Sequence, residues 1–209
     1  MTHTAKRFSD LPLNPALISN LESLAYLAMT EIQASSIPVM LEHRDLIAQA
    51  KTGSGKTAAF GIGILSKLNP SYFATQALVV CPTRELADQV SNELRRLARA
   101  TPNVKILTLC GGTPMRPQIA SLEHGAHIVV GTPGRLLDHI GRSSINLATV
   151  QTLVLDEADR MVDMGFFEDI VGIVAACSPR RQTLLFSATY PNDMRHATSS
   201  FLRDPVEVK

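Results

Sequence analysis

The sequence predicts an α/β fold in which a mostly parallel central sheet is covered by helices on both faces. Two observations support this prediction. Short, continuously apolar segments alternate with helical segments from about residue 46 onward, and strands of that kind belong to sheets that are buried on both faces. Polar or Gly/Pro-rich clusters follow five of these segments, as expected where parallel strands end at one edge of a sheet. The chain has 209 residues, 45% of them hydrophobic, which is enough to bury a full core.

Two helices are expected before the first strand. Asn14 and Pro15 form a typical N-cap and first-turn proline, and apolar residues at helical spacing continue to Leu24. Thr30 begins a second helix that ends near His43.

Strands and helices then alternate regularly. The expected strands are 46–48, 77–81, 105–110, 128–130, 153–155 and 184–186. Helices are expected after four of them, beginning after residue 57, over 84–100, around residue 118 and over 136–140.

The segment 50–57, with the sequence AKTGSGKT, lies between an expected strand and an expected helix. A glycine-rich turn at a helix start directs backbone N–H groups at one point, where the helix dipole also favours anions. The segment matches a P-loop, with Ala50 where the pattern has its first Gly. The alternative is a Gly-Ser loop followed by Lys-Thr by chance, which the flanking strand and helix disfavour. We expect ATP to be bound by Ala50, Lys51, Thr52, Gly53, Ser54, Gly55, Lys56 and Thr57.

Two carboxylates, Asp156 and Glu157, follow another apolar strand of the same sheet. Asp156 is expected to hold Mg²⁺ through water, opposite the hydroxyl of Thr57. Glu157 is expected to orient and deprotonate the water that attacks the γ-phosphate, and Lys56 to contact the β- and γ-phosphates. The alternative is that both acids stand in the first turn of a helix, where the dipole favours negative charge.

Taken together, these motifs resemble those of the DEAD-box ATP-dependent RNA helicases. The tetrad 156–159 reads DEAD, and the other matches occur in order: PTRELA (82–87), GG (111–112), TPGR (132–135) and SAT (187–189). The resemblance covers the chain from end to end and implies the N-terminal RecA-like domain of such a helicase. Segments 95–99 and 106–112 resemble the bacterial DbpA type.

This resemblance implies a domain organisation. Residues 1–33 are expected to be an N-terminal extension with a Q motif that packs on the core, and residues 34–209 to be the RecA-like ATP-binding domain. The second RecA-like domain, with its arginine fingers and the rest of the RNA cleft, is expected outside these residues as a partner within the same protein. A monomer is expected.

In the family, a Q motif recognises adenine. The resemblance assigns this role to Gln33, whose amide can both donate and accept, with Tyr26 stacking on the ring and Phe8 as the upstream aromatic residue. The usual Gly, Pro and Pro are replaced here by Ala25, Met29 and Glu31. Thr30 and Gln33 also fit a capping box, and both roles can hold at once.

The resemblance also implies an RNA track and a coupling element. The sugar–phosphate backbone would be contacted, independently of base sequence, by Thr83, Arg84, Gly112, Thr132, Gly134 and Arg135. Thr83 and Thr132 are also natural N-caps. In the family, the segment that matches SAT (187–189) couples ATP to RNA handling. The carboxylate of Asp159 is expected to accept hydrogen bonds from the hydroxyls of Ser187 and Thr189. The alternative is that these residues only cap or turn the chain, as a Ser or Thr after a strand commonly does.

The expected function is therefore the ATP-binding and hydrolysing half of an RNA helicase that unwinds or remodels RNA locally, with ribosome assembly as a candidate setting. The alternatives are an ATP-gated RNA clamp and a DNA-directed motor. The net charge of +1 favours none of these. Three cysteines without ligand spacing suit a reducing cytosol, and no apolar segment approaches membrane-spanning length. A cytoplasmic protein without membrane contact is expected.

Overall fold

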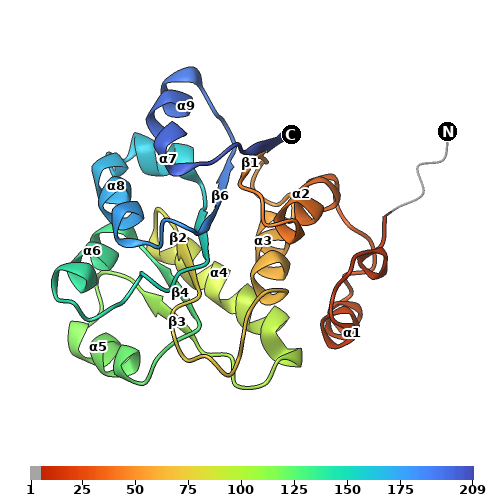
Figure 1. Cartoon of the computed structure of the whole chain (residues 1–209), viewed down its shortest axis with the longest axis horizontal. Helices are drawn as coiled ribbons and strands as arrows, with labels where there is room; N and C mark the ends of the chain where they lie inside the picture. The colour runs from red at the N-terminus through yellow and green to blue at the C-terminus, as the bar shows by residue number, and fades with distance from the viewer. Residues whose placement is uncertain (1–5) are drawn as a thin grey trace.

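The computed structural model describes residues 6–209, in which seven strands form one sheet between layers of helices (Figure 1). The strands are β1 (Leu46–Gln49), β2 (Ala77–Val80), β3 (Ile106–Leu109), β4 (Ile128–Gly131), β5 (Thr152–Leu155), β6 (Gln182–Ser187) and β7 (Val206–Val208). They lie in the order β3-β4-β2-β5-β6-β1-β7, and every neighbouring pair is parallel. The predicted α/β fold with a parallel central sheet is confirmed.

The helices of the described chain connect these strands. They are α1 (Pro15–Ser23), α2 (Glu31–Leu41), α3 (Lys56–Leu65), α4 (Arg84–Leu97), α5 (Met115–Glu123), α6 (Pro133–Gly141), α7 (Ala158–Asp163), α8 (Phe167–Ala176) and α9 (Asn192–Thr198). Short 3₁₀ turns lie at Phe8–Asp10, Ala98–Ala100 and Ser199–Phe201. All six predicted strands and all predicted helices are present. A helix at the position of α7 was considered only in the alternative interpretation of Asp156 and Glu157, and the sequence did not predict α8, α9 or β7.

Local chemistry explains where several helices begin. The side chain of Asn14 accepts the N–H of Ala16 at 2.8 Å, and Pro15 occupies the first turn of α1. The hydroxyl of Thr83 accepts the N–H of Leu86 at 3.3 Å and caps α4. Each cap satisfies an N–H group that has no partner within its own helix.

Side chains that alternate along each strand feed two hydrophobic clusters, one on each face of the sheet. In β1, Leu46 and Ala48 join the cluster that also contains buried residues of α1, α2, α3 and α4. Ile47 points to the other cluster, which contains buried residues of α6, α7, α8 and α9. The sheet is therefore covered on both faces, as its continuously apolar strands require.

The described part of the N-terminal extension packs on the first cluster. Phe8 is only 2% exposed, and Leu17 and Leu21 of α1 are buried beside it. The side-chain amide of Asn20 donates to the carbonyl of Leu97 at 2.9 Å, which fixes α1 to the end of α4. The expected boundary between residues 33 and 34 lies inside α2.

The C-terminal strand completes the sheet at the edge beside β1. Val206 pairs with Leu46, and Val208 with Ala48. The carboxylate of Asp45, just before β1, accepts the N–H groups of Thr183 at 2.8 Å and Arg203 at 2.7 Å. One buried side chain thus joins β1 to β6 and to the approach to β7. None of the helices within residues 6–209 is long and apolar enough to cross a membrane.

Candidate functional site

Strand order divides the carboxyl edge of the sheet into two halves. The loops after β5, β6 and β1 lie side by side and carry the segments predicted to bind ATP and to couple it to RNA. The loops after β3, β4 and β2 lie side by side and carry the segments predicted to contact RNA. Because β2 pairs with β5, the two halves adjoin. Ligands of open parallel sheets bind at this edge.

The loop after β1 has the backbone of an anion cradle. Gly53 and Gly55 have φ values of 81° and 90°, in the left-handed region that favours glycine. A Cβ atom at Gly55 would lie 2.5 Å from the side-chain nitrogen of Gln33, so space as well as conformation requires glycine there. No side chain caps α3, which begins at Lys56. The first N–H groups of α3 are therefore available to phosphate.

Three charged groups meet beneath this loop. The Nζ atom of Lys56 lies 2.9 Å from Oδ1 of Asp156 and 3.7 Å from Oε1 of Glu157. Lys56 is 5% exposed and Asp156 is fully buried. Burial raises the pKa of Asp156, and the adjacent Lys56 opposes that shift. Glu157 has a φ of 53°, an unfavourable conformation that costs about 1–3 kcal/mol and is concentrated at functional sites.

The residues of this half fit a magnesium nucleotide. The Oδ2 atom of Asp156 and the hydroxyl of Ser54 are buried and have no hydrogen-bond partner within the described residues. An adjoining cavity of about 420 Å³, called the nucleotide cavity below, is lined by Thr57, Lys56, Glu157 and the glycines of the loop. Its volume lies within the usual range for small-molecule sites. Thr57 and Asp156 are the residues that would hold the metal.

Gln33 links the Q motif to the loop after β1. Its Oε1 accepts the N–H of Thr30 at 2.9 Å, and the hydroxyl of Thr30 accepts the N–H of Gln33, so the capping box forms. Its Nε2 also donates to the carbonyl of Gly55 at 3.0 Å. One amide N–H and one lone pair of Gln33 have no partner within the described residues. Gln33 is only 2% exposed and does not line the cavity at the P-loop, so its role with adenine stays a prediction.

Tyr26 lines the nucleotide cavity, and Phe8 lies behind it. The two rings meet edge to face, with centroids 6.1 Å apart. The Tyr26 hydroxyl donates to Glu93, and burial together with this carboxylate raises the pKa of Tyr26 to about 12. Phe8 lines a neighbouring cavity instead of the one at the P-loop, so it supports Tyr26.

We expect Gln33→Ala to lower the melting temperature and also to narrow the preference for ATP over GTP. The first effect follows from lost capping, at about 0.5–2 kcal/mol, and the second from the lost amide. Both are measured on the same samples by thermal unfolding and by titration with each nucleotide. Thr30→Ala is the matched control, because it removes the cap and leaves the amide. Equal narrowing of the preference in both variants would contradict adenine recognition by Gln33.

The coupling residues lie together beside the tetrad. The Oδ2 atom of Asp159 accepts the backbone N–H of Thr189 at 2.9 Å and its hydroxyl at 3.0 Å. The hydroxyl of Ser187 instead accepts the backbone N–H of Asp159 at 3.1 Å. Partial burial acts to raise the pKa of Asp159, but hydrogen bonding with Thr189, Ser187 and Arg160 outweighs it and holds the pKa below its ordinary value. Asp159 therefore ties the loop after β6 to the start of α7.

Among the RNA candidates, Arg84 and Gly112 are neighbours. A Cβ atom at Gly112 would lie 3.4 Å from Nη1 of Arg84, and Gly112 has a φ of 77°. Arg84 and Gly134 are exposed, whereas Thr83 caps α4 and Thr132 precedes α6 without a cap bond.

Arg135 differs from the exposed candidates because its side chain is only 12% exposed. Its Nη1 donates to the carbonyl of Thr113 at 2.9 Å and to Oε1 of Gln118 at 3.1 Å. The predicted RNA residue is therefore also part of an internal network.

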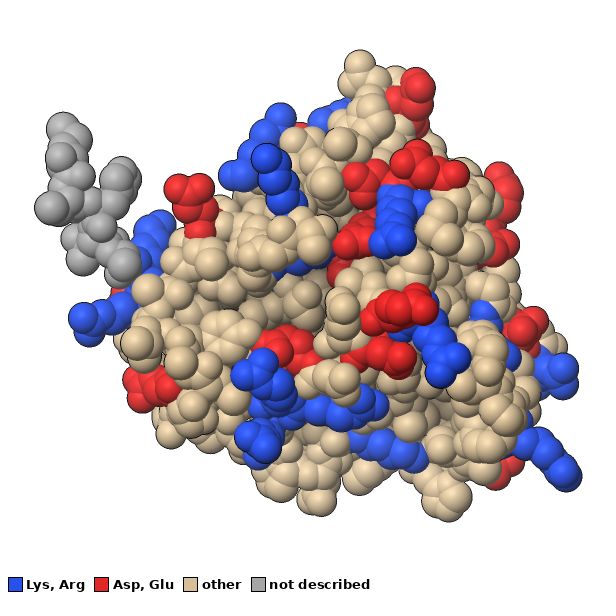
Figure 2. Space-filling model, turned by 180° about the vertical axis from the view of Figure 1, so that it is seen from behind, with Lys and Arg blue, Asp and Glu red and all other residues tan. Residues whose placement is uncertain are grey.

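Charge is mixed over the surface. Figure 2 shows basic and acidic side chains interspersed on one face, without a region of one sign that covers it. The basic residues near the end of α4 are exposed, and Arg96 pairs with Glu93 at 2.8 Å. These arginines form a solvated helix face.

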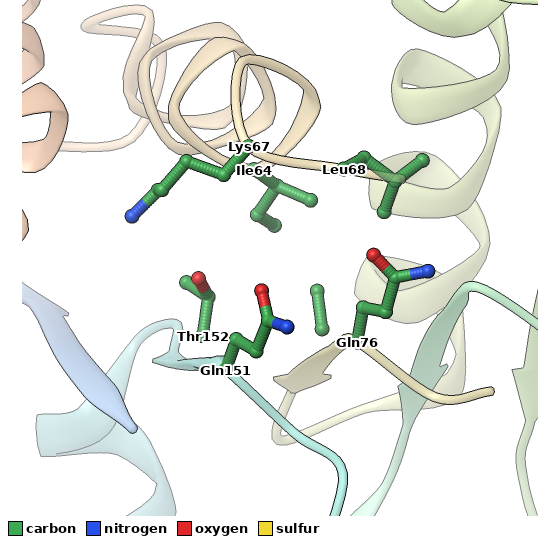
Figure 3. A pocket seen from close by; sticks show the side chains of 7 residues that line it. Ile64, Lys67, Leu68, Gln76, Gln151 and Thr152 are labelled. Atoms are coloured by element: carbon green, nitrogen blue, oxygen red, sulfur yellow. The ribbon is translucent and has the colours of Figure 1, made fainter. Parts of the chain in front are cut away.

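A second cavity, at the end of the sheet where the strands begin, is too small for a nucleotide. It holds about 10 Å³, roughly the room for one water molecule, between the end of α3 and the starts of β2 and β5 (Figure 3). The Lys67 amine donates to Gln182, and burial lowers the pKa of Lys67 to about 8.

Sequence reasoning missed several residues near the site. Gln89 and Glu93 of α4 line the nucleotide cavity, and Arg160 pairs with Oε2 of Glu157 at 3.3 Å. Arg160 follows Glu157 by three residues, a spacing at which helical side chains meet. Gln118 had no comparable local signal, because its partners come from α6 and from the turn after β3.

The comparisons with known proteins all found proteins of one family. The family model described as DEAD/DEAH box helicase matches residues 30–197. The chain is 55% identical over 197 residues to ATP-dependent RNA helicase DbpA of Escherichia coli, which covers 94% of this chain and 43% of that protein. It is 48% identical over 202 residues to DEAD-box ATP-dependent RNA helicase CshA of Geobacillus kaustophilus, covering 97% of this chain and 43% of the relative.

A solved structure is similar over nearly the whole chain. The crystal structure of a DEAD box protein from the hyperthermophile Methanococcus jannaschii superposes with a TM-score of 0.92 and 39% identity, covering 97% of this chain and 55% of that one. The chain spans less than half the length of the two curated relatives, at 43% of each.

Proposed function

This chain belongs to the DEAD/DEAH box helicase family, and from that premise we propose that it forms the ATP-binding and ATP-hydrolysing half of an ATP-dependent RNA helicase. The observation that carries the proposal is the group of Lys56, Asp156 and Glu157 beneath a glycine-rich anion cradle. A cation for phosphate, a buried carboxylate for a metal and a second carboxylate for water are the parts that phosphoryl transfer requires.

Nucleotide binding changes the partner of Lys56. In this structure its ammonium group neutralises Asp156, whereas the phosphates of a bound nucleotide would compete for it. Mg²⁺, when bound, neutralises charge on the β- and γ-phosphates. The same ion, if held by Asp156 and Thr57, would also replace the positive charge of Lys56 beside Asp156. Asp156 would then lose Lys56 without being left as a buried, unpaired charge.

Glu157 is the group that takes the proton. It leaves the sheet at the end of β5, where its left-handed backbone turns the side chain towards the cavity that Lys56 also lines. Its two oxygens lie 3.7 Å from the ammonium group of Lys56 and 3.3 Å from the guanidinium group of Arg160. An ionised carboxylate within reach of a bound water can act as general base.

The adjoining half of the edge would hold RNA by its backbone. Exposed Arg84, the Gly112 turn and the first turn of α6 at Gly134 supply a cation, free backbone groups and a helix N-terminus. We propose local RNA unwinding in the cytoplasm, with a second RecA-like domain closing on ATP and RNA and with ribosome assembly as the setting. Retention of RNA without strand separation would favour a clamp instead.

We expect Lys56→Ala to abolish detectable nucleotide binding, measured by isothermal titration with ATP and ADP. Lys56 is the only Lys or Arg among the residues that line the nucleotide cavity in the described chain. Arg180→Ala, which removes an exposed cation just before β6 at the opposite end of the strands, is the control and should bind normally. A melting curve must accompany the titration, because removal of one partner of a buried ion pair costs about 3–5 kcal/mol. Unchanged affinity in a folded variant would contradict the P-loop assignment.

A further inference from the structure

A polar cluster joins α5, α6 and the turn after β3, with Gln118 at its centre. The Nε2 of Gln118 donates to the carbonyl of Cys110 at 3.2 Å and to the hydroxyl of Thr113 at 2.8 Å. Its Oε1 accepts from Nη1 of Arg135 at 3.1 Å and faces Nε2 of His139 at 2.8 Å. These four contacts use the whole capacity of an amide side chain.

The partners fix the orientation of the Gln118 amide. A guanidinium group can only donate and a peptide carbonyl can only accept, so Oε1 faces Arg135 and the nitrogen faces Cys110. The ring nitrogen of His139 that faces Oε1 must then carry a hydrogen. Burial, with the charge of Arg135 beside it, lowers the pKa of His139.

The turn that Gln118 holds contains two exposed glycines, Gly111 and Gly112. Glycine lets the backbone of a turn adopt many conformations. A turn whose backbone is not restricted by other contacts would therefore lose conformational entropy when it bound a ligand. Gln118 and the Thr113 hydroxyl, which donates to Cys110 at 3.0 Å, restrict this turn before any ligand arrives. Restriction of this kind raises affinity.

The same cluster fixes one side of the Arg135 guanidinium. Nη1 is held by Thr113 and Gln118, and Nε lies 3.8 Å from the carboxylate of Asp138. Nη2 makes no hydrogen bond within the described residues and is not among their enclosed polar atoms. It is therefore available to a phosphate oxygen, in a direction set by the internal contacts.

We infer that Gln118 is a positioning residue for RNA, which holds the Gly111–Thr113 turn and the Arg135 guanidinium in the geometry that receives backbone phosphates. The inference rests on the proposed function, since these groups are RNA contacts only if the chain binds RNA. Gln118 need not touch RNA itself.

The test is the affinity of the folded 209-residue chain for a labelled oligouridine, measured by fluorescence anisotropy over a series of KCl concentrations. Gln118→Met has a similar volume and lacks the four polar contacts. Its affinity is expected to fall about fivefold to tenfold, with the slope of log affinity against log salt reduced by about 1. ATP affinity should not change.

Two control variants separate positioning from stability. Ser144→Ala removes a contact at the far end of the same cluster, where the Ser144 hydroxyl lies 2.7 Å from Nδ1 of His139. It should lower the melting temperature and leave RNA affinity unchanged. Gln151→Met makes the same substitution at the small cavity where the strands begin (Figure 3) and should change neither quantity.

A double-mutant cycle with Arg135→Ala provides the decisive reading. If Gln118 acts through Arg135, the loss in the double variant is at least about threefold smaller than the product of the two single losses. Multiplicative losses would overturn the inference, as would unchanged RNA affinity in folded Gln118→Met. If the wild-type chain binds no RNA at low salt, the RNA part of the proposed function fails, and this inference fails with it.

Discussion

Covalent joining of residues 1–209 to a second RecA-like domain that carries an arginine finger is expected to raise ATP turnover by about 10³–10⁵-fold. Charge that develops on the γ-phosphate needs a cation besides the one that holds the ground state. Among the described residues, Lys56 is the only cationic side chain lining the nucleotide cavity, and Arg160 is paired with Glu157 at 3.3 Å. The chain alone should therefore bind nucleotide, hydrolyse it slowly and separate no strands.

The C-terminal strand favours such a joining. Val208 pairs in parallel with Ala48, so Lys209 leaves the sheet at the edge that carries the P-loop. A domain attached there would begin beside the nucleotide, at high effective concentration. The same domain added in trans should rescue far less activity.

The measurement is steady-state ATP hydrolysis and strand displacement, with and without RNA, for the 209 residues alone, for the mixture and for the joined protein. Robust RNA-stimulated turnover by the 209 residues alone would contradict the expectation. It would mean that the catalytic cation lies within them.

The second large effect is expected from Glu157→Gln in the two-domain protein, with hydrolysis reduced by about 10²–10⁴-fold. The amide keeps the size of the side chain but cannot accept the proton of the attacking water. Binding of ATP and RNA should persist, because Lys56 and the contacts after β2, β3 and β4 remain.

Single-turnover hydrolysis is the appropriate measurement, since it separates chemistry from product release. Glu123→Gln, at the exposed end of α5, is the matched control and should hydrolyse ATP normally. A rate near wild type for Glu157→Gln would exclude Glu157 as the base.

Local sequence was sufficient for much of this molecule. Continuously apolar strands and the polar clusters that follow them predicted the sheet and its functional edge, because both depend on neighbouring residues. Helix α8 also carried a readable signal, since Ile170, Ile173 and Val174 have helical spacing and are buried together. Strand β7 has three residues at the sheet edge and is held by distant β1, so it gave no comparable pattern.

Long-range contacts account for what could not be predicted. The hydroxyl of Tyr26 donates to Glu93, 67 residues away, which no spacing rule reveals. Arg135 was predicted as an RNA contact, but its internal partner Gln118 becomes visible only when α5 packs beside α6. The adenine, metal and RNA roles themselves stay predictions.

The position of β1 in the sheet also affects how the chain can fold as it is made. Strands β2 to β5 pair only among themselves until β6 exists, and can begin to do so once residue 131, the end of β4, has been synthesised. In contrast, β1 pairs only with β6 and β7, and its neighbour Asp45 binds Thr183 and Arg203, which follow 138 and 158 residues later. Pairings over such separations form late and leave apolar edges open to aggregation meanwhile. The first strand to leave the ribosome is therefore among the last of this sheet to be paired, and the P-loop gains its supporting strands only after residues 182–208 have been made.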